Sequence, residues 1–264
     1  KGEWYMFLDA DEIFTDTTGI IDFFISGEYK KYNSATYVVR NYNDYEKTGY
    51  ADFVAPRLTK ILPHTKFEKS IHEGLNTYAF PLKNLDNAIC DHFGYVLTDE
   101  TAKNKCRRNL PLILNEHEKS PDDSMIYMQL VEAYKGIDED EALRYCDEGI
   151  ELNNRVPHYS AHMIYLHNAE LLAKKKKYEE ASSAIEDREN FKKRPDVDSV
   201  VGMDIDFYYT KAFIFVNMEK TAEAISAFRE YSAFYKDFCL KGKYHTVDTM
   251  LGGIKYANPD SLAN

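Results

Sequence analysis

Residues 4–12 read WYMFLDADE, an apolar run that ends abruptly on three carboxylates. A short apolar run of this kind is typical of a β-strand that is buried on both faces. Asp9 and Asp11 then stand at the carboxyl end of the predicted strand. Because ligands of α/β sheets bind at the carboxyl ends of strands, the stretch predicts an α/β sheet with a polar site at its edge.

The same mixed pattern of strands and loops continues from residue 1 to about residue 97. β-Branched and aromatic residues, which favour strands, gather there in short runs separated by turn residues. The predicted elements are a short helix over 19–32 and strands over 36–42, 53–62 and 88–95.

From about residue 98 to the end, the apolar residues follow a helical period instead. A long amphipathic helix is expected over 100–119 and stops before Pro121. Further helices are expected over 122–134 and 138–152, and Gly136 ends the first of them. The sequence therefore predicts an α/β part followed by an all-α part.

Small residues recur at matching places in three successive predicted helix pairs. Ala142, Ala181 and Ala224 mark these places. They lie roughly 40 residues apart, against the ~34-residue period of tetratricopeptide repeats. The pattern loosely resembles that repeat family, in which small residues allow two helices to approach closely and large aromatics fill the gaps. A generic helical bundle is the alternative.

Composition and charge exclude several classes of protein. The chain has 264 residues, 33 Lys and Arg against 44 Asp and Glu, and a formal net charge of −11. The acidic balance argues against a nucleic-acid partner, which needs a basic face. A hydrophobic content of 44% excludes wholesale disorder. No apolar run approaches the ~18 residues of a membrane span.

Cysteine usage indicates the compartment. The four cysteines lie far apart with no CxxC pair, which favours free thiols in a reducing, cytoplasmic compartment. The chain shows neither an initiator Met nor a signal peptide, so we expect it to be part of a longer protein. The cysteines are Cys90, Cys106, Cys146 and Cys239.

The two aspartates after the first predicted strand suggest metal chemistry. Side chains two residues apart in an extended chain point the same way. Asp9 and Asp11 would then form a hard-oxygen half-site for Mg²⁺ or Mn²⁺, with positions left for water and phosphate oxygens. The alternative is an acidic turn that caps a following helix.

Four segments of the chain, in this order, resemble one known family. Residues 4–12 resemble the metal-binding segment of family 2 glycosyltransferases with the GT-A fold. The closer similarity is to the bacterial branch that carries tetratricopeptide-like helices and includes peptide S-glycosyltransferases acting on bacteriocins. The other segments are PRLTK at 56–60, FEKSIHE at 67–73 and DHFGY at 91–95, which resemble the family's PRLFR, FxGxVHE and HYGY.

Two departures from the family pattern are Lys69 in place of Gly and Thr59 in place of Phe. The resemblance implies that 1–97 is the C-terminal part of a GT-A catalytic domain, a mixed sheet. Residues 98–121 would be a linker helix and 122–264 a tetratricopeptide-like helical domain. The family's N-terminal nucleotide-binding half has no counterpart here, so we expect this chain to be inactive by itself.

The resemblance also implies a reaction: metal-dependent, inverting transfer of a sugar from a nucleotide-sugar donor. A UDP-sugar is the favoured donor, and the acceptor would be a peptide, a glycan or another cell-surface molecule. Asp11 would bind Mn²⁺ or Mg²⁺, with Asp9 on the metal or the ribose. His92 would be a further metal ligand; the alternative is a structural histidine between strand and linker helix.

The remaining site residues are assigned in the same way. Glu73 would act as the base that accepts the acceptor's proton, and His72 would position the acceptor or the donor sugar. The alternative for Glu73 is a carboxylate favoured at a helix N-terminus. Arg57 could bind phosphate through its planar fork, although a strand arginine more often pairs with a neighbouring carboxylate.

The helical part predicts a second kind of partner. Stacked helix pairs present a concave face of the kind that binds peptides or subunits, so a homodimer or a protein partner is the expected use of this face. The rival to the glycosyltransferase hypothesis is therefore a non-catalytic helical-repeat protein-interaction module, in which the Asp-Ala-Asp corner is structural.

Overall fold

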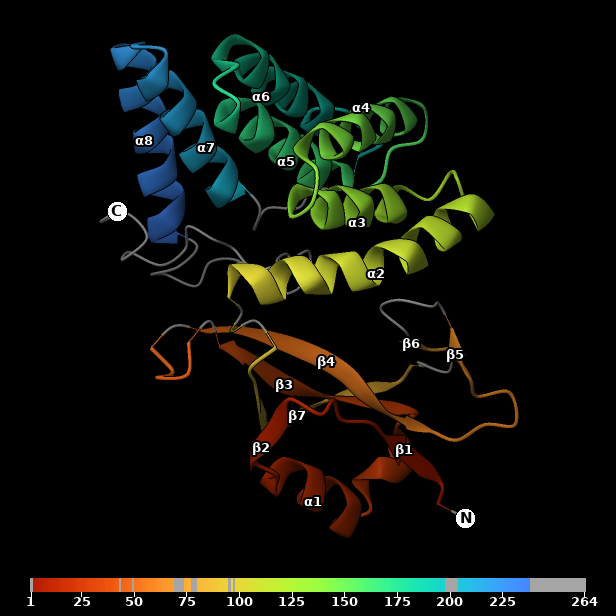
Figure 1. Ribbon diagram of the computed structural model, residues 1–264. Coiled ribbons are helices and arrows are strands. Elements are labelled where there is room, and N and C mark those ends of the chain that lie inside the picture. The colour runs from red at the N-terminus through yellow and green to blue at the C-terminus, as the bar shows by residue number, and fades with distance from the viewer. Residues whose placement is uncertain are drawn as a thin grey trace. The chain divides into compact units, whose positions relative to one another are not determined.

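The computed structural model describes residues 2–42, 44–48, 50–68, 74–76, 80–94, 96, 98–197 and 204–237. The chain divides into two compact units, Lys1–Thr101 and Ala102–Asn264. In Figure 1 the first unit, coloured red to orange, holds a β-sheet and the helix labelled α1, and the coloured part of the second, yellow to blue, is helical. An α/β part followed by a part made of paired helices is thus confirmed at this coarse level.

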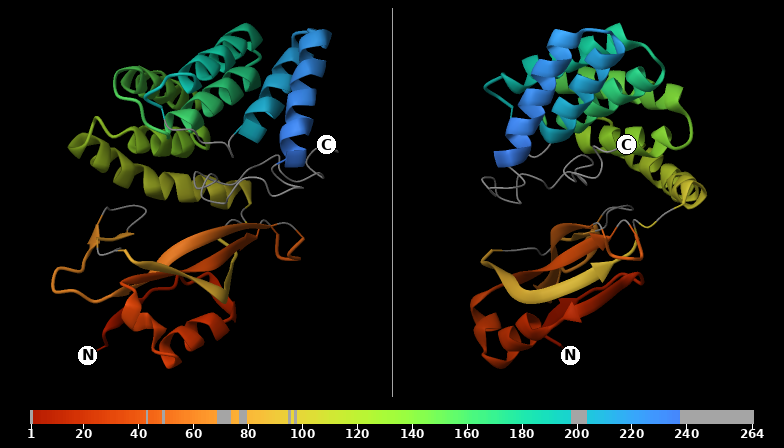
Figure 2. Two further views of the ribbon diagram at one scale, coloured as in Figure 1. Left: turned by 180° about the vertical axis from the view of Figure 1, so that it is seen from behind. Right: turned by 90° about the vertical axis from the view of Figure 1, so that its left-hand side faces the viewer.

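The first unit is built on a mixed, curled sheet (Figure 2). Its strand order is β1-β4-β3-β7-β2, and β3 and β7 are parallel while the other neighbours are antiparallel. A separate two-stranded ladder joins β5 and β6. The strands are β1 (Trp4–Met6), β2 (Glu12–Asp16), β3 (Ser34–Tyr42), β4 (Tyr50–Lys60), β5 (Phe67–Glu68), β6 (Gly74–Leu75) and β7 (Leu82–His92).

Helix α1 (Thr18–Ile25) packs on the sheet through Phe23, which is 2% exposed, and a short 3₁₀ helix, η1 (Glu28–Lys31), follows it. Trp4 packs edge-on against Phe23, with ring centres 5.5 Å apart. The buried cluster between α1 and the sheet consists of Phe23, Ala35, Tyr37, Val39, Ala55, Leu58, Leu85, Ala88 and Cys90.

The first strand differs from its prediction. The apolar run at its start predicts burial on both faces, yet Tyr5 is 38% and Met6 45% exposed. The reason is position, because among the described strands β1 pairs with β4 alone and lies at the edge of the sheet.

A strand that the sequence analysis did not predict follows the aspartates, where the alternative interpretation placed a helix cap. β2 begins at Glu12 and runs antiparallel to β7, with Glu12 opposite His92. Residues 7–11 therefore connect β1 and β2, the two edge strands of the sheet, and this connection carries both aspartates.

In the described part of the second unit, a long helix is followed by helices that pack as consecutive pairs (Figure 2). Helix α2 confirms the long helix expected over 100–119, and the pairs are α3 with α4, α5 with α6 and α7 with α8. The helices are α2 (Asp99–Lys119), α3 (Ser124–Lys135), α4 (Glu139–Arg155), α5 (Ala161–Lys174), α6 (Tyr178–Lys192), α7 (Asp204–Asn217) and α8 (Thr221–Tyr235).

Local signals explain where two of these helices begin. The Asp123 carboxylate accepts a hydrogen bond from the backbone N–H of Met125 at 2.9 Å and caps α3. Asp138 caps α4 by accepting from the backbone N–H groups of Asp140 and Glu141 at 3.0 and 3.2 Å. Such caps satisfy donors that a helix start leaves unpaired, which is why they are visible in the sequence.

The small residues predicted at helix contacts are buried. Ala142 and Ala181 are fully buried and Ala224 is 4% exposed. At Gly149 a Cβ atom would lie 3.0 Å from Ile164 Cδ1 and 3.1 Å from Tyr127 Cβ, so α4 lies close against its neighbours there. No helix of the described residues combines the length and the apolar character that crossing a membrane requires.

Candidate metal centre

Residues 9–12 form a turn that is closed by hydrogen bonds between its own residues. The backbone N–H of Glu12 donates to the carbonyl of Asp9 at 3.1 Å, and the N–H of Asp9 donates to Glu12 Oε2 at 3.1 Å. The sequence argument assumed an extended chain at Asp9 and Asp11, and this assumption was wrong because the chain turns here. As a result, the carboxylates of Asp9 and Asp11 have different partners.

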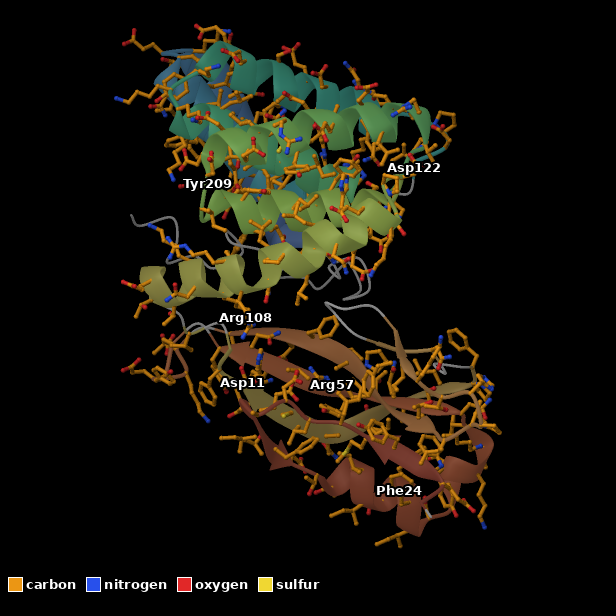
Figure 3. All side chains as sticks on the ribbon, turned by 45° about the vertical axis from the view of Figure 1, so that its right-hand side comes forward. Asp11, Phe24, Arg57, Arg108, Asp122 and Tyr209 are labelled. Atoms are coloured by element: carbon orange, nitrogen blue, oxygen red, sulfur yellow. The ribbon has the colours of Figure 1, made fainter. Side chains whose placement is uncertain are left out.

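Arg57 on β4 is the partner of the first carboxylate (Figure 3 labels Asp11 and Arg57). Its NH2 lies 2.9 Å from Asp9 Oδ2 and 2.7 Å from Glu12 Oε1, and its NH1 donates to Glu12 Oε2 at 3.1 Å. Its guanidinium carbon lies 4.9 Å from the ring centre of Phe7. The sequence left two roles open for Arg57, binding phosphate or pairing with a neighbouring carboxylate. The structure shows the pairing, and the contact with phosphate stays a prediction.

Glu12 is a buried carboxylate that the sequence argument did not single out. Its side chain is fully buried. Burial raises the pKa of Glu12, while the Asp9 N–H and the charge of Arg57 lower it in part. Because a buried carboxylate needs a charged partner, Glu12 and Arg57 together fix the turn that presents Asp11.

Asp11 and His92 come together across the β2–β7 ladder. Asp11 Oδ2 lies 3.5 Å from His92 Nε2. The backbone N–H of Phe93 also donates to the Asp11 carbonyl at 3.3 Å, which ties the turn to the end of β7. The side chain of Asp11 is 51% exposed and that of His92 is 15% exposed, so the pair is open on one side to a ligand.

The Asp11–His92 spacing fits a divalent cation. Ligand atoms at neighbouring positions on such an ion lie roughly 3.0–3.5 Å apart, since each bond is about 2.0–2.2 Å long. A carboxylate oxygen and an imidazole nitrogen suit Mn²⁺, and a carboxylate alone suits Mg²⁺. No group of three His, Cys, Asp or Glu side chains among the described residues could hold a metal ion. A bound ion would therefore take its other ligands from water or from a substrate oxygen.

The two predicted catalytic residues, His72 and Glu73, lie outside the described residues, and so does Tyr95 of the last family-like segment. The start of the FEKSIHE segment is described. Phe67 packs edge-on against Phe7 with ring centres 5.5 Å apart. The segment that leads to His72 and Glu73 therefore starts next to the strand that leads to Asp9.

Two further residues lie at the pair: Asn41, which has no signal in the sequence, and Gly94, which lies in the DHFGY segment but was given no role. Asn41 on β3 contacts the other ring nitrogen of His92, and Gly94 lies directly against both Asp11 and His92. The register between β3 and β7 brings Asn41 opposite His92. The local pattern of apolar residues in either strand does not predict this register.

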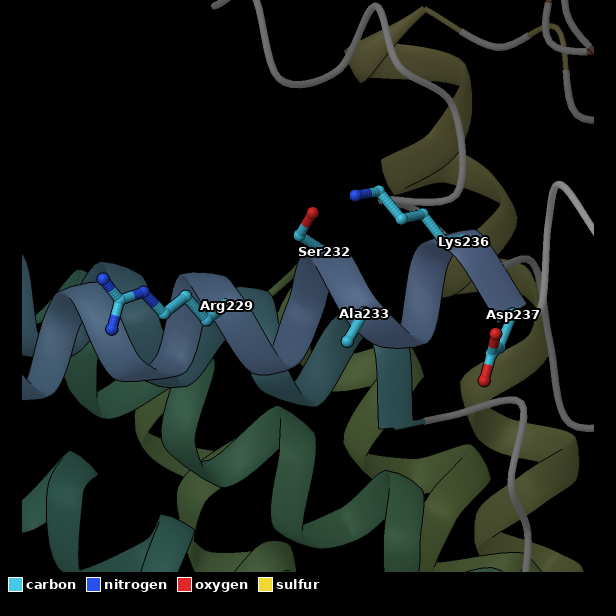
Figure 4. Close-up of a pocket in the computed structure, with 5 residues that line it drawn as sticks. All are labelled: Arg229, Ser232, Ala233, Lys236 and Asp237. Carbon is cyan, nitrogen blue, oxygen red and sulfur yellow. The ribbon is translucent and has the colours of Figure 1, made fainter.

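The helical unit has surface hollows that involve none of the predicted site residues. One of about 410 Å³ is lined by Arg229, Ser232, Ala233, Lys236 and Asp237 at the end of α8 (Figure 4). Another of about 550 Å³ is lined by residues 119–124 and 156–158. The lining of the second hollow includes the carboxylates Asp122 and Asp123 and the imidazole of His158.

Comparison with protein-family models gives no match for this chain. Comparison with curated proteins gives no match either.

Proposed function

We propose that these residues belong to a metal-dependent, inverting glycosyltransferase that uses a nucleotide-sugar donor. In this proposal the sheet is part of a GT-A catalytic domain and the helix pairs form a tetratricopeptide-like domain. The observation that carries the proposal is the 3.5 Å approach of Asp11 Oδ2 to His92 Nε2. It joins two of the family-like segments, which lie far apart in the sequence, in one site.

The reaction divides the work among the chain's own residues. Asp11 and His92 would hold Mn²⁺ or Mg²⁺, which supplies a Lewis acid for the charge that develops on the leaving diphosphate. Arg57 and Glu12 keep the turn in the shape that presents Asp11. The acceptor hydroxyl or thiol attacks the anomeric carbon as the bond to the diphosphate breaks. The acceptor's proton passes to a carboxylate, a role that the resemblance assigns to Glu73.

The test uses the protein encoded by the complete reading frame that contains these residues. Transfer from a panel of UDP-sugars is measured with Mn²⁺ present, for the unchanged protein and for Asp11→Asn. We expect the variant to lose transfer because the isosteric amide cannot supply an anionic metal ligand. Asp22→Asn is the control, since Asp22 is exposed on α1 and the change in charge is the same. Undiminished transfer by Asp11→Asn would contradict the proposal.

One observation favours the rival interaction module. Arg57 binds Asp9 and Glu12 within the turn, so a purely structural role accounts for part of the acidic corner. Titration of the same complete protein with UDP and Mn²⁺ by calorimetry separates the two functions. The glycosyltransferase predicts binding that Asp11→Asn weakens, whereas the interaction module predicts no nucleotide binding at all.

A further inference from the structure

We propose that Asn41 and Gly94 allow His92 and Asp11 to bind a divalent cation. Asn41 is a positioning residue that sets the tautomer of His92, and Gly94 leaves the space next to His92 Nε2 and Asp11 Oδ2 free of a side chain. The inference rests on the proposed function, because it concerns the same pair of side chains. It assigns roles to two residues that the sequence argument left without any.

Asn41 sets which nitrogen of His92 carries the proton. Its Oδ1 lies 2.6 Å from His92 Nδ1, and the parallel β3–β7 ladder places the two residues opposite each other. An amide oxygen only accepts hydrogen bonds, so Nδ1 must be the donor. In the neutral ring, Nε2 then carries a lone pair on the side of Asp11, which is the form a metal ion needs.

In this tautomer the Nε2 lone pair faces the negative carboxylate of Asp11, and a positive charge between them removes their repulsion. Nε2 and the Asp11 carboxylate oxygen lie 3.5 Å apart, and both are electron-rich in this tautomer. Two such atoms repel each other in a partly buried site unless a positive charge lies between them, either a proton on Nε2 or a metal cation. A divalent cation satisfies both at once, at the spacing found for neighbouring ligands.

Gly94 keeps the space at this pair open. A Cβ atom at position 94 would lie 2.4 Å from His92 Nε2 and 2.6 Å from Asp11 Oδ2. Gly94 is not among the described residues with positive φ, so the need is for space and not for an unusual backbone conformation. Both crowded atoms are ends of side chains, so alanine would be accommodated by pushing Asp11 and His92 apart while the strands stay in place.

The role of Asn41 is tested first on the metal-free chain, by nitrogen-15 NMR of the His92 ring. We expect the Nδ1–H tautomer in the unchanged protein and in Asn41→Asp, whose carboxylate also accepts. Asn41→Leu should lose that tautomer preference. Asn84→Ala is the matched control, because it removes another asparagine bond within the sheet, the 2.8 Å contact with Thr36 Oγ1. An unchanged tautomer in Asn41→Leu would overturn the role of Asn41.

The second step adds Mn²⁺ alone and follows the paramagnetic broadening of the His92 ring signals. Loss of an outer-shell partner typically weakens metal binding by about 10–100-fold, and we expect that loss in Asn41→Leu but not in Asn41→Asp. Gly94→Ala should abolish specific broadening while its circular dichroism and melting temperature stay close to the unchanged protein. Gly2→Ala is the control glycine, since its Cβ meets only the Trp4 carbonyl oxygen at 3.6 Å.

The outcomes separate this inference from the proposed function. Mn²⁺ binding by Gly94→Ala at the unchanged affinity would overturn the role of Gly94. Absence of specific broadening in the unchanged chain would overturn the cation site itself. Asn41-dependent Mn²⁺ binding in a protein whose sugar transfer survives Asp11→Asn would uphold the inference and overturn the glycosyltransferase proposal.

Discussion

Arg57 and Glu12 show how a single buried pair shapes the candidate site. Glu12 is fully buried and Arg57 is 16% exposed at its side chain, so the carboxylate relies on the guanidinium for its charge balance. The pair also draws in Asp9, which leaves Asp11 as the acidic side chain that faces His92. The buried carboxylate of Glu12 therefore decides that Asp9 pairs with Arg57 while Asp11 faces His92.

Arg57→Met tests this pair. Removing one partner of a buried ion pair leaves an uncompensated charge and destabilises a protein by about 3–5 kcal/mol, the loss we expect at pH 7. Without Arg57 the pKa of Glu12, already raised by burial, rises further. A raised carboxyl pKa means that the folded state holds the proton more tightly, so the deficit is smaller near pH 4 and grows as pH rises through the folded pKa.

Urea unfolding of Arg57→Met at pH 4 and pH 7 measures the effect. The double variant Arg57→Met with Glu12→Gln is the control, because it removes the buried charge as well and should recover much of the stability at pH 7. Equal deficits at both pH values would mean that Glu12 does not depend on Arg57.

At the scale of elements, the contact of α4 with its neighbours depends on the absence of a side chain at Gly149. The Cβ position there is already 3.0 Å from Ile164 on α5 and 3.1 Å from Tyr127 on α3. Cys146, one turn earlier on α4, is also fully buried. Helices pack closely where small residues line one face, and this packing links two successive helix pairs.

Gly149→Val should therefore destabilise the helical unit. Overpacking a tight contact costs about 1–3 kcal/mol, which exceeds what valine gains over glycine in helix propensity. Asn154→Val on the exposed side of α4 is the control for propensity without crowding. Thermal unfolding followed at 222 nm compares the two, and a Gly149→Val protein as stable as Asn154→Val would show that α4 can move aside.

For the whole molecule, the division into two units is matched by separate buried clusters. Leu58 belongs to the cluster beneath α1, and Leu166 belongs to the cluster formed by α5, α6 and α7. Both residues are almost fully buried, at 1% and 2% exposed. Each cluster lies within one unit, so each unit has its own source of stability.

Leu58→Ala and Leu166→Ala form a matched pair for testing this division. Each should lower the unfolding free energy of its own unit by about 2–5 kcal/mol, because it removes buried methyl groups and leaves a cavity. Amide hydrogen exchange should then lose protection in β3 and β4 for the first variant and in α5 and α6 for the second. If each variant lowered protection equally in both units, the two would unfold together.

Much of the helical half could be predicted from the sequence because its signals are local. Asp123 and Asp138 cap helices by accepting from N–H groups only two or three residues further along the chain. A Pro or a Gly that ends a helix likewise acts at or next to the position it occupies. The apolar period then shows which face of each helix is buried. The coarse order of an α/β part and a helical part followed from these patterns alone.

The candidate site could be predicted only as a set of residue types. Asp11 and His92 were chosen from the sequence, but their 3.5 Å contact results from the antiparallel β2–β7 register, and β2 itself was missed. The extended Asp9–Asp11 geometry was wrong because the buried Glu12–Arg57 pair closes the turn.

The sequence by itself determined the long helix over 100–119, the approximate starts of the two helices that follow it, and which residues have the chemistry to bind a metal. Only the tertiary structure decided that Asp11, His92, Asn41 and Gly94 meet at one place. The physical reason is that caps and helical periods act over a few residues. Strand order and register are instead settled by packing between segments that lie tens of residues apart.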